Sequence, residues 1–134
     1  MRSLIQADLE RRVASLTNEE RRKAGLRRLT PQPLLGQAAR AHSTDMAARY
    51  YFSHVSLEGA TVADRVALTG YAYAIVGENI AWGQENALQA VNAWMRSPGH
   101  KANILSPDYT EIGVGVAEYR GALVWTQNFA SPFS

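Results

Sequence analysis

The sequence predicts an α+β fold in which helices cover a small antiparallel sheet. Three observations support this. Apolar residues follow helical spacing in the first half, an apolar extended segment and a further helix come next, and the last third alternates apolar residues with glycine. The chain has 134 residues, of which 46% are hydrophobic and 19% charged. These values suit one domain with one core, residues 1–134, with residues 1–30 as its basic N-terminal part.

Two long helices are expected in the first fifty residues. Apolar residues at helical spacing predict the first over residues 3–24, and Gly25 suits the position just after its end. The second is expected from about Pro33, which suits a first helical turn, to Tyr50. His42 lies on its apolar face, so a packed core histidine is favoured over a ligand.

A loop is expected over residues 51–59, and it carries His54. The aromatic run of residues 50–52 is expected to anchor this loop to the core. A short helix should follow over residues 62–68, because Thr61 is a suitable N-cap and a glycine stands just after its end.

An apolar and aromatic stretch over residues 71–83 predicts an extended segment that leads to a short strand near Glu78. Asn86 is expected to cap the next helix, with a glutamine three residues on completing a capping box. The Ser-Pro-Gly sequence at residues 97–99 is expected to end that helix and to leave His100 in a loop.

A β-hairpin is expected at the C-terminal end. Apolar residues at 112, 114 and 116 alternate with small ones, residues 118–121 form the turn, and residues 123–129 return as the second strand. Gly113 and Gly115 leave one strand face nearly bare, so another backbone or a ligand should approach it closely.

Charge is unevenly spread along the chain. Residues 1–30 hold eight basic and four acidic residues, although the net charge of the whole chain is only +2. The cluster formed by Arg21, Arg22, Lys23, Arg27 and Arg28 favours a solvated helix face over a site for an anionic partner. The chain has no cysteine, which excludes disulfides, thiol catalysis and thiolate metal sites.

Three ionisable residues stand at element ends or beside glycine: His54, Glu78 and His100. Two imidazoles and one carboxylate can form an open zinc site, or can work as a base with an orienting acid. Their intervals of 24 and 22 residues match no local metal motif. Spacing alone therefore favours a third interpretation, in which these side chains tie loops together or line a polar cleft without chemistry.

Other catalytic motifs are absent from the sequence. Ser97 lies near His100, but no G-x-S-x-G elbow surrounds it, and Ser-Pro-Gly suits a helix end better than a nucleophile. The chain has no GxGxxG, no P-loop and no EF-hand loop, so nucleotide and calcium-signalling roles have no support.

Six segments, in this order, resemble the CAP superfamily, also called the SCP domain family, and most closely its bacterial branch. They are LTNEERRKAGL, LLGQAARAHSTDMA, YFSHVS, GENIAWG, AVNAWMRSPGHKANILSPDYTEIGVGVA and WTQNFA. Together they extend from about Leu16 to Phe129. The cysteines typical of eukaryotic members are missing, as in much of the bacterial branch.

The resemblance implies an α-β-α sandwich with a large cavity that carries two histidines and two acidic residues. By position, His54 resembles the first histidine, Glu78 the first glutamate and His100 the second histidine. Ser97 stands where many eukaryotic members have the second glutamate, and the later Glu111 is not its equivalent. The missing acid counts against catalysis by the full set of four but leaves a His-Glu-His metal site.

The family has no single agreed activity, and its members have been linked to divalent metals, to sterols or lipids and, in isolated cases, to proteolysis. We therefore expect a ligand-binding domain without established catalysis, with a divalent metal such as zinc as the first candidate ligand. Asn79, Ser97 and Asn103 are expected to orient the two histidines and the glutamate without contacting the ligand themselves.

Two alternatives stay open. In one, the protein is a zinc-assisted hydrolase with Glu78 as general base. In the other, the basic N-terminal helix binds an anionic surface, a lipid or a cell-wall polymer.

The sequence also bears on location and partners. It shows no secretory signal and no apolar run long enough for a membrane span, and we expect no nucleic-acid partner. Either the protein stays inside the cell or the chain is the mature part of an exported protein. The resemblance favours an extracellular, periplasmic or wall-associated location.

Overall fold

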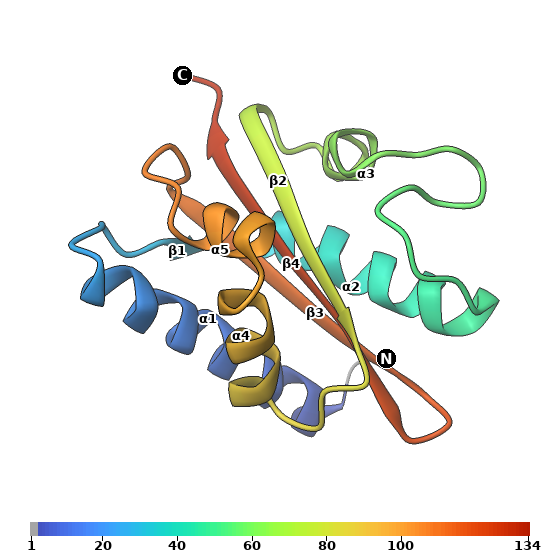
Figure 1. Cartoon of the computed structure of the whole chain (residues 1–134). Helices are drawn as coiled ribbons and strands as arrows, with labels where there is room; N and C mark the ends of the chain where they lie inside the picture. Colours follow the sequence, from blue (N-terminus) through green and yellow to red (C-terminus); the bar gives the residue numbers. More distant parts are fainter. Residues whose placement is uncertain (1–2) are drawn as a thin grey trace.

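A four-stranded sheet lies between two helical layers in the computed structural model, which describes residues 3–134 (Figure 1). The strand order across the sheet is β1-β3-β4-β2. In chain order the elements are α1 (Leu4–Lys23), β1 (Thr30–Pro31), α2 (Pro33–Arg49), α3 (Val62–Leu68), β2 (Tyr73–Trp82), α4 (Ala87–Met95), α5 (Pro98–Ile104), β3 (Glu111–Tyr119) and β4 (Ala122–Pro132). Helices α1, α4 and α5 cover one face, and α2 and α3 cover the other. The predicted α-β-α sandwich is therefore confirmed.

The sheet is mixed, whereas the sequence predicted a purely antiparallel one. Strands β2 and β3 each pair antiparallel with β4, but β1 pairs parallel with β3 through Thr30 and Pro31. A two-residue strand has no alternation that a sequence pattern could reveal. Strand β2 is also longer than predicted, because its first half lies on an exposed sheet edge and carries no clear alternation of burial.

The caps of the first two helices explain where they begin and end. Ser3 caps α1 in a capping box with Gln6, and Gly25 follows the helix with φ of 77°, a conformation that favours glycine. Helix α2 begins at Pro33 as predicted. It ends at Arg49, one residue earlier than predicted, and the C-cap residue Tyr50 adopts the left-handed conformation with φ of 52°.

Helix α2 packs directly on the bare face of β3. A Cβ at Gly113 would overlap the backbone of Leu35, and one at Gly115 would overlap the backbone of Ala39 and Arg40. The predicted close approach at these two glycines is confirmed, and the approaching group is the backbone of α2. This contact fixes the distance between the helix and the sheet.

The segment after α4 differs from the prediction. Ser97 and Pro98 do end α4, but Pro98 also begins α5, and His100 lies in the first turn of that helix rather than in a loop. Proline is favoured in the first helical turn because its missing N–H has no helical partner there. The same dipeptide therefore ends one helix and starts the next.

The basic cluster of the N-terminal helix is only partly a solvated face. Arg22 and Lys23 are exposed and form ion pairs with Glu19 and Glu20, as favoured from the sequence. Arg21, however, is fully buried, and its guanidinium donates to three backbone carbonyls, those of Arg27, Ile104 and Ser106. It joins α1 to the segments that follow α1 and α5.

Candidate functional site

The candidate site is centred on Glu78, on the edge strand β2. Its side chain is 1% exposed, and both carboxylate oxygens are bound. Arg65 of α3 donates to Oε2 at 2.7 Å and to Oε1 at 3.1 Å, while Nδ1 of His54 lies 2.9 Å from Oε1. Arg65 also donates to the backbone carbonyl of His54 at 2.6 Å, so one guanidinium holds both residues in place.

These contacts keep Glu78 ionised. Burial acts to raise its pKa, but the hydrogen bonds from His54 and Arg65 and the charge of Arg65 outweigh burial, so the net pKa is lowered. A buried carboxylate without such partners would become protonated instead. The site therefore contains a fixed negative charge that Arg65 already balances.

The carboxylate also fixes the tautomer of His54. Because Glu78 accepts, Nδ1 of His54 carries the proton, and in the neutral imidazole Nε2 is left with its lone pair. The His54 side chain is 53% exposed. The arrangement is that of a histidine oriented by a carboxylate, which is how many ligand-binding histidines are held in position.

His42 lies behind Glu78 as a core residue, as predicted. It is 1% exposed, and Nε2 lies 2.8 Å from the backbone carbonyl of Ser53 and 4.0 Å from Oε1 of Glu78. Burial lowers the pKa of His42, which keeps the ring neutral. Its Nε2–H therefore holds the loop that carries His54.

His100 reaches the same edge of the sheet from α5. Its backbone carbonyl accepts from Nδ2 of Asn79 at 3.1 Å, and Asn103 donates to Oδ1 of Asn79 at 2.9 Å and to the carbonyl of Glu78 at 3.2 Å. Burial, and then the charge of nearby His54, lower the pKa of His100. The hydrogen bonds of Asn79 and Asn103 thus hold the backbone of α5, and with it His100, against β2.

Of the three residues predicted to support the site, Asn79 and Asn103 form hydrogen bonds there, whereas Ser97 does not. Asn79 and Asn103 tie β2 to α5, and the buried Asn79 also donates to Gln127 of β4 at 3.0 Å. Ser97 is the N-cap residue of α5, and its side chain makes no capping hydrogen bond. Among the described residues, the side chain of Ser97 forms no hydrogen bond with a residue of the candidate site.

Arg65 is the site residue that the sequence did not predict. It follows Thr61 in the short helix α3 and stands 13 residues before Glu78, with no motif joining the two. The burial of Glu78 between apolar neighbours was the available signal, because such a carboxylate needs a cation or several hydrogen-bond donors. That requirement gives no indication of which arginine supplies them.

The predicted His54–Glu78–His100 set does not present three free metal ligands. Within residues 3–134 no group of three His, Cys, Asp or Glu side chains is placed to hold a metal ion. Arg65 and His54 occupy both oxygens of Glu78. Glu78 therefore orients His54 and is not available as a free third ligand.

An exposed aromatic cluster borders the loop that carries His54. Tyr50 and Phe52 are 69% and 54% exposed, so the prediction that the aromatic run anchors the loop to the core is wrong for these two. Tyr50 stacks on Tyr119 with ring centroids 4.9 Å apart, and Phe52 meets Trp82 edge-on. Only the middle residue of the run, which is partly buried, packs against the core.

Comparison with known proteins is consistent with this fold. The profile of the CAP family, described as the cysteine-rich secretory protein family, matches residues 14–129. The uncharacterized Bacillus subtilis protein YkwD is 44% identical over 120 residues, which are 90% of this chain and 46% of that protein. The B. subtilis membrane protein YlbC is 38% identical over 93% of this chain and 35% of its own length. The chain thus spans less than half the length of these relatives.

Two solved structures share the architecture. An extracellular SCP-domain protein from Bacillus anthracis superposes with a TM-score of 0.89 and 32% identity, covering 94% of this chain and 41% of that one. An outer surface protein from Borrelia burgdorferi gives a TM-score of 0.87 at 21% identity, covering 99% and 97%. The second likeness shows the fold alone.

The α-β-α sandwich, with its histidine–carboxylate pair at the edge strand, defines the class of the protein. The chain belongs to the CAP family and is of the bacterial type. Among the described residues, no helix is long and apolar enough to cross a membrane.

Proposed function

We propose that the protein binds a ligand through His54 and His100 at the edge of the sheet. The observation that carries this proposal is the hydrogen bond between Nδ1 of His54 and Glu78, because it leaves Nε2 of a half-exposed imidazole free to accept or to coordinate. Arg65 supports this role, since it balances the charge of Glu78 and holds the backbone of His54.

A divalent metal ion is the first candidate ligand, and zinc is its first probe. Neutral imidazole nitrogens are good zinc ligands, and a carboxylate behind a ligating histidine raises its basicity. His54 and His100 would hold the ion, while Glu78 would hold the proton on Nδ1 of His54. Asn79 and Asn103 would keep α5, and with it His100, against β2.

Calorimetric zinc titration of the wild type and of the His54→Ala/His100→Ala variant tests this proposal. Binding by the wild type and its loss in the variant are expected, with circular dichroism showing that both fold. His42→Gln is a control that changes the third histidine, because glutamine can still donate to Ser53. Equal zinc affinity in the wild type and the double variant would place the metal elsewhere.

The hydrolase alternative depends on Glu78 as a general base. Its bound oxygens and lowered pKa make it a weak base, so the geometry favours a positioning role over proton abstraction. Peptide, ester and glycan substrates offered to the zinc-treated protein test the alternative. Activity that disappears in Glu78→Gln while zinc affinity is kept would support it.

An extracellular or wall-associated location is part of the same proposal. It is supported by the similarity to the B. anthracis SCP-domain protein, which is described as extracellular. Fractionation of the source cells, followed by immunoblotting of wall, membrane, medium and cytosol, tests it. Detection in the cytosol alone would refute it.

A further inference from the structure

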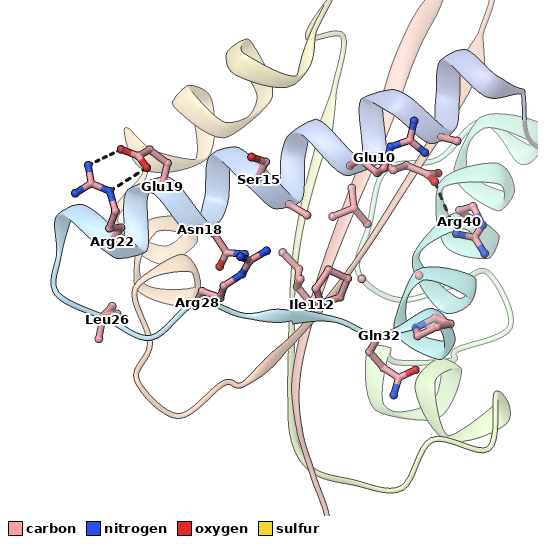
Figure 2. A pocket seen from close by; sticks show the side chains of 18 residues that line it. Glu10, Ser15, Asn18, Glu19, Arg22, Leu26, Arg28, Gln32, Arg40 and Ile112 are labelled. Carbon is pink, nitrogen blue, oxygen red and sulfur yellow. Dashed lines mark hydrogen bonds and ion pairs between the residues drawn. The ribbon is translucent and has the colours of Figure 1, made fainter.

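A groove with a cavity volume of about 660 Å³ lies between α1 and α2 (Figure 2). Its walls are α1, the start of α2 and residues 26–33, and it reaches strand β3 at Ile112, Gly113 and Val114. The candidate site lies at β2, the opposite edge of the sheet. The two places can therefore be tested independently.

The groove lies along an incompletely paired strand edge. Strand β1 covers β3 only at Glu111 and Ile112, whereas β3 continues to Tyr119. The carbonyl of Ile112 accepts from a residue of the 26–33 segment, and the N–H of Val116 donates to the carboxylate of Glu10 at 3.1 Å. Every second residue of a strand directs its backbone groups to the same edge, so Val114, between these two, also faces this edge.

The charges around the groove are unbalanced toward the positive. Four arginines line it, and its two carboxylates are already paired. Glu19 binds Arg22 at 2.6 Å, and Glu10 lies 3.7 Å from Arg40. Figure 2 shows these pairs on opposite sides of Arg28, which points toward α1 from the 26–33 segment. Among the described residues, Arg28 forms no ion pair and no hydrogen bond.

The floor and sides of the groove combine apolar and polar groups. Ile112 and Val114 form the floor, and Ala14 and Leu26 add apolar surface from the sides. Polar groups stand beside them, among them the exposed hydroxyl of Ser15. An open strand edge needs a partner with backbone donors and acceptors, which a hydrocarbon chain does not supply.

We propose that this groove binds an extended acidic segment of a partner protein. The segment adds to the edge of β3 at Val114, its apolar side chains face the floor, and an acidic side chain pairs with Arg28. Main-chain hydrogen bonds supply affinity in this mode of recognition, and side-chain pockets and charges supply specificity. Salt weakens the interaction, because its ion pairs are partly exposed.

The probe is a fluorescein-labelled heptapeptide that alternates glutamate and valine, with a lysine–valine heptapeptide as its counterpart. Fluorescence anisotropy should show binding of the acidic peptide and none of the basic one. Arg28→Glu should weaken binding at least tenfold, whereas Arg12→Glu, an exposed change on α1 that does not line the groove, should leave it within twofold. In amide NMR spectra, the shifts induced by the peptide should centre on Val114.

Four results would overturn the proposal. Three of them are no binding of the acidic peptide, equal weakening by Arg28→Glu and Arg12→Glu, and amide shifts that centre on the edge of β2. A fourth is that dodecyl phosphate binds in an Arg28-dependent way while the peptide does not, which would make the occupant a single-chain amphiphile. Ser15→Trp fills the groove from an exposed helix position without changing its charge. Loss of peptide binding in this variant is expected and would support the proposal.

Discussion

Arg65 binds both carboxylate oxygens of Glu78, at 2.7 and 3.1 Å, from a helix that ends five residues before strand β2 begins. This pair decides what the candidate site can do. Glu78 is buried and ionised, and its charge is already balanced by Arg65. It therefore orients His54 and does not offer a free carboxylate. The proposed ligand would therefore contact the exposed side of the His54 imidazole.

Removing Arg65 should destabilise the protein strongly. Arg65→Gln leaves the Glu78 charge buried without its cation, and breaking such a pair costs about 3–5 kcal/mol. The free energy of unfolding from urea titration at pH 7 measures the loss. Arg96→Gln, at an exposed arginine, is the matched control and should change stability by less than about 0.5 kcal/mol.

A double-mutant cycle then tests whether the pair acts as a unit. Arg65→Gln combined with Glu78→Gln should be less destabilised than the sum of the two single variants, because no uncompensated charge remains. Strict additivity would show that the two residues do not interact in solution.

Stability should fall as the pH is lowered from 7.5 to 5.5. Burial lowers the pKa of His42 in the folded state, so the unfolded chain takes up a proton below about pH 6.5 before the folded chain does. The contribution of neutral His42 to the stability is therefore fully present above that pH, and it is lost as the pH falls toward the lower pKa of the folded state. One such group contributes at most about 1.4 kcal/mol per pH unit.

The variant His42→Gln isolates this effect. Urea titrations at both pH values should show a smaller loss in the variant than in the wild type. The loss should not disappear entirely, because burial also lowers the pKa of His100. An identical pH dependence in both proteins would mean that His42 does not carry the effect.

The contact between α2 and β3 gives a prediction about packing. Gly113→Ala places a methyl group on the backbone of Leu35, and overpacking of this kind typically costs about 1–3 kcal/mol and occasionally more. Gly99→Ala is the control, since a Cβ there would meet nothing within 4 Å and the backbone is not left-handed. Thermal unfolding should show a clear drop in Tm for the first variant alone.

Substitution of the adjacent residues Arg21 and Arg22 should lower the stability by very different amounts. Arg21→Met removes the buried donor to three backbone carbonyls, and each polar group left unsatisfied costs about 1–3 kcal/mol. Arg22→Gln removes only an exposed i,i+3 pair, worth less than about 1 kcal/mol. Urea unfolding of both variants compares them directly, and comparable losses would contradict the burial of Arg21.

Much of the fold could be predicted because its signals are local. The caps Thr61 and Asn86 and the glycine-rich strand each depend on residues within a few positions of one another. The hairpin turn is also a local feature. Its two central residues, Arg120 and Gly121, both have positive φ, as a two-residue type I′ turn requires.

The parts that could not be predicted depend on distant residues. Thr30 pairs with Glu111, and Arg21 donates to Ile104, across more than eighty residues in each case. Arg65 and Glu78 are close in sequence, but neither helical nor strand periodicity connects them. Sequence patterns find elements, whereas the partner of a buried charge follows from how the elements are packed.

The central claim is that His54 and His100 bind a ligand while Glu78 stays behind His54. Nitrogen-15 NMR of the imidazole side chains during zinc titration tests it most directly. We expect zinc to shift the Nε2 resonance of His54 and a resonance of His100, while Nδ1 of His54 stays protonated and His42 does not change. Zinc-induced shifts confined to His42, or deprotonation of Nδ1 in His54 with Glu78 as the new ligand, would contradict it.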